Sequence, residues 1–88
     1  MKQTVIIHER IKRNHPSICE EDMLWAWNSR QLCQVRLEKS LKRYVAFGFD
    51  GKGRPLQMVA TYDLKADTVL IFHAMVLTSK VMRELGLI

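Results

Sequence analysis

The run of residues 42–49 constrains the fold most, because a glycine-rich turn and two further strand-like runs follow it. Val45 and Phe47 fall on one face of this predicted strand, since alternate residues of a strand point to opposite sides. The other face carries Ala46 and Gly48 and has little side-chain volume. The Asp-Gly-Lys-Gly sequence that follows has the glycines typical of a hairpin connection. The pattern predicts an antiparallel meander with a positively charged start.

Strand patterns also cover residues 31–38, 55–62 and 68–75. The last of these runs is apolar on both faces, which is typical of a strand with neighbours on both sides. Residues 4–14 have apolar positions at helical spacing, and the Pro at position 16 would end that helix. A last helix is predicted over residues 77–85.

A second helix is predicted to begin near Ser17, which forms a capping-box pattern with Glu20. Trp25 and Trp27 lie two positions apart in this helix, so their rings point roughly 200° apart and one of them should be exposed. We therefore expect an α+β domain over residues 1–88, with a four-stranded antiparallel sheet, two N-terminal helices and one C-terminal helix. A chain of 88 residues forms one domain with a thin core.

The chain carries 14 Lys and Arg against 9 Asp and Glu, a net charge of +5. This charge favours polyanions or an acidic protein as partners, although plain solubility explains it equally well. Cys19 and Cys33 have no metal-binding spacing, and two reduced thiols in a cytoplasmic protein are the expectation. No stretch approaches the roughly 20 apolar residues of a membrane span, so no membrane association is expected.

Basic residues gather around the first strand of the meander, and these are Arg36, Lys39, Lys42 and Arg43. They are candidates for phosphate contacts, or else a solvated edge that prevents aggregation between strands. Tyr44 and Tyr62 are candidates for stacking on RNA bases, or else half-buried tyrosines of a sheet. Trp25 is a candidate anchor for a protein partner, or else packs against a loop.

Histidines are the remaining candidates for chemistry. His73 alternates with apolar residues in the last strand, where it is either a hydrogen-bonded core residue or an acid–base catalyst. His8 and His15 share a face of the first predicted helix, but no third ligand accompanies them, so no metal site is predicted. No cofactor motif is evident, because the Gly-x-Gly of the hairpin is not followed by a helix.

Several local motifs together resemble the RelE/ParE toxin superfamily, and most closely its BrnT-like branch. Asn14-His15 followed by Ile18-Cys19-Glu20-Glu21 is similar to the Lys-His-Gly-Val-x-Phe-Glu-Glu junction of that branch. Arg43-Tyr44-Val45-Ala46-Phe47-Gly48 is similar to its Arg-Tyr-x-x-x-Gly strand. Ile71-Phe72-His73-Ala74 with Thr78 is similar to its Ile-Ile-Ser-Ala-Arg-x-Ala-Thr ending. The matches span residues 8–85 in the family's order.

The resemblance implies a toxin that cuts mRNA without a metal, inhibits translation and is held in check by a small antitoxin protein. RNA cleavage through the 2′-OH needs a base, an acid and cations around the phosphate. His73, Arg43 and Lys80 are the residues expected to supply them, with RNA or the ribosome as the target and no small-molecule cofactor. The chain departs from the family at His73, where relatives carry Ser, and at Met75 and Val76, where they carry a basic residue.

That departure supports an alternative function, a non-catalytic binding protein that has kept the fold and lost the ribonuclease site. A third hypothesis is a general RNA- or DNA-binding protein, and it depends on the positive net charge alone.

Overall fold

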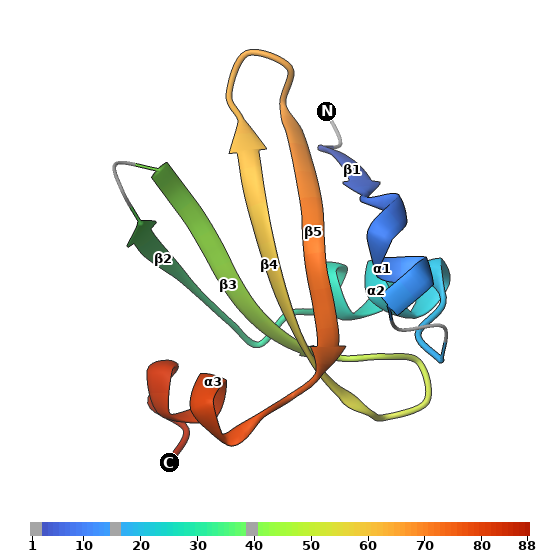
Figure 1. Ribbon diagram of the computed structural model, residues 1–88, viewed down its shortest axis with the longest axis vertical. Coiled ribbons are helices and arrows are strands. Elements are labelled where there is room, and N and C mark those ends of the chain that lie inside the picture. Colours follow the sequence, from blue (N-terminus) through green and yellow to red (C-terminus); the bar gives the residue numbers. More distant parts are fainter. Residues whose placement is uncertain (1–2, 15–16, 39–40) are drawn as a thin grey trace.

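The computed structural model describes residues 3–14, 17–38 and 41–88. Its elements are β1 (Thr4–Ile7), α1 (Glu9–Asn14), α2 (Glu20–Asn28), β2 (Leu32–Glu38), β3 (Leu41–Phe49), β4 (Pro55–Asp63), β5 (Thr68–Val76) and α3 (Ser79–Glu84). The strands form one five-stranded sheet in the order β1-β5-β4-β3-β2. Figure 1 shows α1 and α2 together beside β1 and β5, and α3 apart from them at the opposite end of the sheet from the β4–β5 turn.

The predicted four-stranded antiparallel sheet with two N-terminal helices is wrong, because the N-terminal segment supplies a fifth strand. Thr4–Ile7 pairs in parallel with residues 68–71 of β5, so the sheet is mixed. The segment contains four β-branched residues in a row, and such residues favour strands. Pairing turns Val5 and Ile7 towards the core, while Ile6 stays half exposed. The predicted helix over residues 4–14 is reduced to the single short helix α1.

The meander itself is confirmed. Strands β2, β3, β4 and β5 pair antiparallel in sequence order. The Asp50 carboxylate organises the β3–β4 turn by accepting hydrogen bonds from the backbone N–H groups of Lys52 (2.9 Å) and Arg54 (2.8 Å) and from the Arg54 Nε (2.7 Å). Gly53 has a φ of +83°, a conformation that favours glycine.

The Arg54 guanidinium extends this turn to α2, where its Nη2 lies 3.2 Å from the buried Asp22 carboxylate and 3.2 Å from the Ser17 carbonyl oxygen. Burial opposes ionisation of Asp50, but hydrogen bonds from Arg54 and Lys52 outweigh it and hold the Asp50 pKa below its usual value. Helix α2 begins after Cys19, so the predicted cap at Ser17 is wrong. The hairpin turn and the start of α2 are therefore joined by a charged network.

The apolar residues form two clusters, one on each face of the sheet, rather than the single core that strand alternation and helix stripes suggest. On the face covered by α1 and α2, called here the α2 face, Trp27 and Ile71 are buried together with ten other residues. On the opposite face, called here the α3 face, Val45 and Phe47 pack with Val81 of α3. Two thin layers therefore stabilise one sheet.

Gly48 explains how α2 approaches the sheet so closely. A Cβ atom on Gly48 would lie 2.2 Å from the carbonyl oxygen of Ala26 and 3.2 Å from the Cα of Arg30. The small face of β3 that the sequence shows is therefore the surface on which the C-terminal end of α2 packs. As the helical spacing predicts, the two tryptophans of this region differ, with Trp27 4% exposed and Trp25 63% exposed.

A register shift in β5 gives the α3 face an extra residue. Val59 of β4 pairs with His73, and Ala60 pairs with Ile71, so Phe72 is left between the two pairs. A bulge of this kind places two neighbouring side chains on the same side of the sheet. Phe72 packs against the α3-face cluster, and His73 lies opposite Val59 of that cluster.

Candidate functional site

A groove on the α3 face gathers basic and aromatic side chains from four elements and the end of β1. Helix α3 covers only one end of this face and leaves the other end without a helix over it (Figure 1). The groove has a volume of about 430 Å³ and is lined by His8, Arg10, Arg43, Thr61, Leu70 and Phe72. We call it the cationic groove.

The Phe72 ring holds two guanidinium groups at the centre of the cationic groove. The Cζ of Arg43, on β3, lies 5.1 Å from the ring centroid, and the Cζ of Arg10, on α1, lies 5.6 Å from it. The Arg10 Nε also donates a hydrogen bond of 3.0 Å to the Phe72 carbonyl oxygen. Ile71 is the last residue of β5 that pairs with β1, and Phe72 follows it. Arg10 therefore binds a backbone carbonyl group of β5 just beyond the end of β1. The two positive charges are therefore oriented by one ring.

His8 stands exposed where β1 passes into α1. Its backbone N–H donates to the Ile71 carbonyl oxygen (2.9 Å), which continues the β1–β5 ladder by one residue. Its Nδ1 accepts a hydrogen bond of 3.1 Å from the backbone N–H of Arg10. Because Nδ1 is an acceptor, the neutral ring carries its proton on Nε2, and this atom is turned away from the helix start.

His73 is half-buried and contacts a chain of polar groups that leads to α3. Gln57 Oε1 accepts hydrogen bonds from both the backbone N–H and the hydroxyl of Thr78, each 2.8 Å long. A backbone N–H can only donate, so these bonds fix the amide orientation and turn the Gln57 Nε2 towards the Nε2 of His73, 3.4 Å away. Thr78 in turn caps α3. His73 thus contacts the network that positions the C-terminal helix.

Arg36 faces Arg43 across the β2–β3 pair, where two like charges would repel each other. The Glu84 carboxylate of α3 relieves this repulsion by binding Arg36 through two hydrogen bonds, one of 2.8 Å from Nε to Oε2 and a second from Nη2 to Oε1. Arg36 therefore lies on the predicted face but joins β2 to α3. Lys39 lies outside the described residues.

The other predicted RNA-binding residues lie on the opposite side of the sheet. Lys42, Tyr44 and Tyr62 alternate with the α3-face residues and therefore project from the α2 face. The structure thus brings Arg43 and His73 to one face but does not place them with the tyrosines. Lys80 is exposed in the first turn of α3. Trp25 is exposed beside Leu24 and Asn28 of α2.

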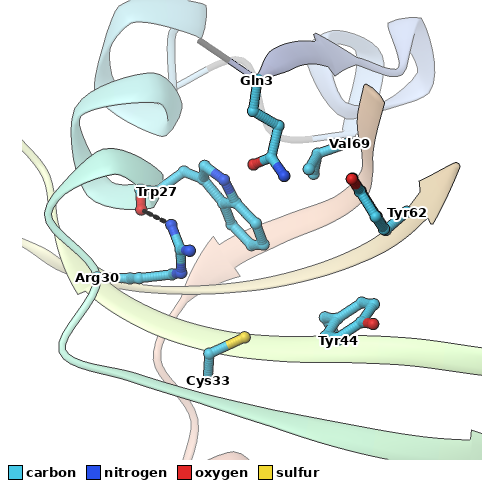
Figure 2. Close-up of a pocket in the computed structure, with 7 residues that line it drawn as sticks. All are labelled: Gln3, Trp27, Arg30, Cys33, Tyr44, Tyr62 and Val69. Atoms are coloured by element: carbon cyan, nitrogen blue, oxygen red, sulfur yellow. Dashed lines mark hydrogen bonds between the residues drawn. The ribbon is translucent and has the colours of Figure 1, made fainter. Parts of the chain in front are cut away.

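A second cavity, on the α2 face, contains the two tyrosines. It measures about 210 Å³ and is lined by Gln3, Trp27, Arg30, Cys33, Tyr44, Tyr62 and Val69. Figure 2 shows Trp27 and Arg30 on one side of this space and the two tyrosines on the other. The Tyr62 hydroxyl donates a 2.7 Å hydrogen bond to Asp67, and this bond together with burial raises the pKa of Tyr62. We call this cavity the aromatic pocket.

Sequence reasoning missed His8 and Arg10 as members of a site, because it placed them inside a long N-terminal helix. The signal that identifies them is the Thr-Val-Ile-Ile run before them, which forms β1 and carries the following residues to the edge of β5. Within the described ranges, no three His, Cys, Asp or Glu side chains are grouped closely enough to hold a metal ion.

Comparisons of the chain with protein-family models, with curated proteins and with solved structures found no match. Among the helices that the structure describes, none is long and apolar enough to cross a membrane. Any assignment of function therefore depends on the chemistry of the two sites.

Proposed function

We propose that the protein is an endoribonuclease that binds single-stranded RNA in the cationic groove and cleaves it with its own side chains. The observation that carries the proposal is the convergence of Arg10 and Arg43 on Phe72, next to the exposed imidazole of His8. Two converging guanidinium groups favour an anion with several oxygen atoms, such as a phosphate diester. The net charge of +5 favours a polyanion in the same sense.

Of the groups that RNA cleavage of this kind needs, the cationic groove contains the imidazole of His8 for one proton transfer and two guanidinium groups for the phosphate, and a water molecule would take part in the other proton transfer. A base removes the proton of the 2′-OH, the 2′ oxygen attacks the adjacent phosphorus, and the bond to the 5′ oxygen breaks as an acid protonates that oxygen. The products are a 2′,3′-cyclic phosphate and a 5′-hydroxyl. Negative charge grows on the phosphate oxygens in the transition state, and Arg10 and Arg43 would stabilise it there.

Two histidines compete for the proton transfer. His8 is exposed and lines the cationic groove, and its Nδ1 is engaged by the Arg10 backbone, which leaves Nε2 as the nitrogen that would exchange the proton. His73, the acid–base candidate of the sequence analysis, lies next to Phe72 on the same face, but its Nε2 is turned towards Gln57. We assign the main proton transfer to His8 and retain His73 as the second candidate. Lys80 stays a predicted phosphate contact.

The biological setting is proposed from the sequence resemblance. A chain related to the RelE/ParE toxin superfamily would be the toxin of a type II toxin–antitoxin pair, act on mRNA in the cytoplasm, inhibit translation and be masked by a small antitoxin protein. An antitoxin that covered the cationic groove would supply carboxylates to its arginines. Trp25 is exposed on α2, over the opposite face of the sheet, and is a candidate anchor for an antitoxin segment that reaches that face.

The first test measures RNA binding. A labelled single-stranded RNA is titrated with wild-type protein, Arg10→Gln and Arg43→Gln over a series of salt concentrations. Each substitution should reduce the slope of log K against log salt by about 1, since one phosphate contact is lost. Arg13→Gln is the matched control, because Arg13 lies on the same helix, is exposed and contacts only Glu9, at 3.9 Å, among the described residues. Equal slopes for all four proteins would contradict the proposal.

The second test measures cleavage. Purified protein is incubated with the same RNA in the presence of a metal chelator, and the product ends are identified. His8→Gln should lower the rate by about 10²- to 10⁴-fold, as expected for loss of a general acid or base, with an unchanged melting temperature. A loss of the same size in His73→Gln but not in His8→Gln would reverse the assignment between the two histidines.

The second candidate function, a binding protein without catalysis, is favoured by the contact between His73 and Gln57 and by the apolar residues at positions 75 and 76. It predicts that the salt dependence responds to Arg10→Gln and Arg43→Gln while the RNA stays intact. Inducible expression in a bacterial host distinguishes the two functions in cells. Only a ribonuclease toxin arrests growth, and Arg43→Gln should then restore it.

A further inference from the structure

We infer that the aromatic pocket on the α2 face is a binding site for a single nucleobase, separate from the cationic groove. Its lining combines three aromatic rings with a guanidinium group and a primary amide. The cationic groove lies on the opposite face of the sheet, so this inference does not depend on the function proposed for that groove.

The size of the aromatic pocket suits a flat ring. Its volume of about 210 Å³ exceeds the roughly 150 Å³ of a cavity known to hold benzene, and a nucleobase with one or two rings falls in this range. Tyr44 and Tyr62 form one wall and Trp27 forms the other (Figure 2). Proteins bind unpaired bases by stacking them on such side chains, because every base has a π-face.

The polar groups of the aromatic pocket suit the edge of a base. Trp27 is 4% exposed, and among the described residues no acceptor lies within hydrogen-bonding distance of its Nε1. Figure 2 shows this nitrogen on the edge of the ring that is turned towards Gln3. A buried donor without an acceptor is unfavourable, and a carbonyl or ring nitrogen of a base would satisfy it. The Gln3 amide hydrogen-bonds to Tyr62, and its remaining N–H and its carbonyl oxygen would suit the edge of a base.

Arg30 is fixed in a flat arrangement at the mouth of the aromatic pocket. Its Cζ lies 4.6 Å from the Trp27 ring centroid, and its Nη1 donates a 2.9 Å hydrogen bond to the Trp27 carbonyl oxygen. The guanidinium is therefore stacked on the indole and keeps further N–H groups for a ligand. Arg30, and the exposed Lys42 two residues before Tyr44 on β3, would favour the phosphate of a nucleotide outside the pocket.

Contacts within the free protein hold both walls of the aromatic pocket in place. Tyr62 is held by its hydrogen bond to Asp67. The end of α2, which carries Trp27, and Arg30 just after it are held against β3 at Gly48. Side chains fixed in this way lose little conformational entropy when a base enters.

The test follows the indole N–H signals of ¹⁵N-labelled protein by NMR. The chain contains two tryptophans, and the exposed Trp25 provides an internal control. Adenosine and guanosine 5′-monophosphate, uridine 5′-monophosphate, ribose 5-phosphate and a short single-stranded RNA are added in separate titrations. A nucleobase site predicts a saturable shift of the Trp27 signal with at least one nucleotide or with the RNA, and no shift of that signal with ribose 5-phosphate.

Variants complete the test. Tyr44→Leu keeps an apolar side chain on β3 and removes the ring, so it should weaken nucleotide binding by about 5- to 150-fold. Arg13→Gln, which lies outside the linings of both the aromatic pocket and the cationic groove, should leave nucleotide binding unchanged. A shift with RNA but not with nucleotides assigns the base to an RNA chain, whereas a shift with nucleotides assigns it to a free ligand. Equal shifts with ribose 5-phosphate, or no shift with any probe, would overturn the inference.

Discussion

The packing of α2 on β3 can be tested by adding a single methyl group at Gly48. Gly48→Ala would place a Cβ atom 2.2 Å from the Ala26 carbonyl oxygen, 3.0 Å from the Ala26 carbonyl carbon and 3.2 Å from the Arg30 Cα. Ordinary contacts between non-bonded carbon atoms lie at about 3.5–4.0 Å, so helix and strand must separate by about 1 Å. All three neighbours are backbone atoms, and no side-chain rotation relieves the clash.

The magnitude follows from two opposing effects. Overpacking of a core costs about 1–3 kcal/mol, and a clash with backbone alone belongs at the upper end of that range. Replacing glycine by alanine recovers about 0.4–1 kcal/mol, because the unfolded chain loses conformational freedom. The free energy of unfolding should therefore fall by about 2 kcal/mol, which for a domain of this size lowers the melting temperature by roughly 8–16 °C.

Thermal unfolding followed by circular dichroism measures this effect. Gly51→Ala is the matched control, since no atom lies within 4 Å of its would-be Cβ and its φ is not in the left-handed region. The control should stay within about 0.5 kcal/mol of the wild type. If Gly48→Ala melts within two or so degrees of the control, α2 does not approach β3 as described, and the position of Trp27 and Arg30 loses its explanation.

Three further predictions follow from the charged and polar contacts. The Asp50 pKa is lowered in the folded state. The contribution of this carboxylate to stability is therefore present above the unfolded pKa of about 3.9 and is lost as the pH falls through the lower folded value. Asp50→Asn should be less stable at neutral pH, and urea melts at several pH values should show a flatter acid dependence for this variant. The Tyr62 pKa is raised in the folded state, so its pH effect is the reverse: its contribution to stability is present below the unfolded pKa of about 10 and is lost as the pH rises through the folded value. Tyr62→Phe should remove this part of the loss of stability at alkaline pH. An unchanged alkaline profile would contradict the hydrogen bond to Asp67. Arg36 is paired with Glu84, so Arg36→Gln should leave the salt slope of RNA binding unchanged while destabilising the protein, and a slope reduced by about 1 would show that this arginine binds phosphate instead.

The sequence predicts the meander well because its signals are local. Alternating residues and turn glycines between positions 31 and 75 define the four strands, and the small face of β3 anticipates the contact of Gly48 with α2. The fifth strand depends on pairing between residues 4–7 and 68–71, which no local pattern reveals. Even so, residues 68–75 read as a central strand, and a four-stranded meander would leave them at an edge. That conflict was the available sign of β1.

The candidate site was predicted in part for the same reason. Arg43 and His73 come from strands whose phase the alternation fixes, and both lie on the α3 face. The tyrosines were grouped with the basic residues by closeness in sequence, although alternation places Tyr44 and Arg43 on opposite sides. His8 and Arg10 join the cationic groove only through the parallel pairing of β1, and the Glu84 partner of Arg36 comes from the far end of the chain.

The parallel pairing of β1 with β5 also sets when the cationic groove can exist during synthesis. Arg10 emerges from the ribosome early, but its partner Phe72 is 62 residues further along the chain. At about 5–20 residues per second, roughly 3–12 seconds of translation separate the two. Until β5 has emerged, β1 has no strand to pair with, and His8 and Arg10 are not held near Arg43. A ribosome making this protein therefore holds an incomplete groove until β5 has emerged.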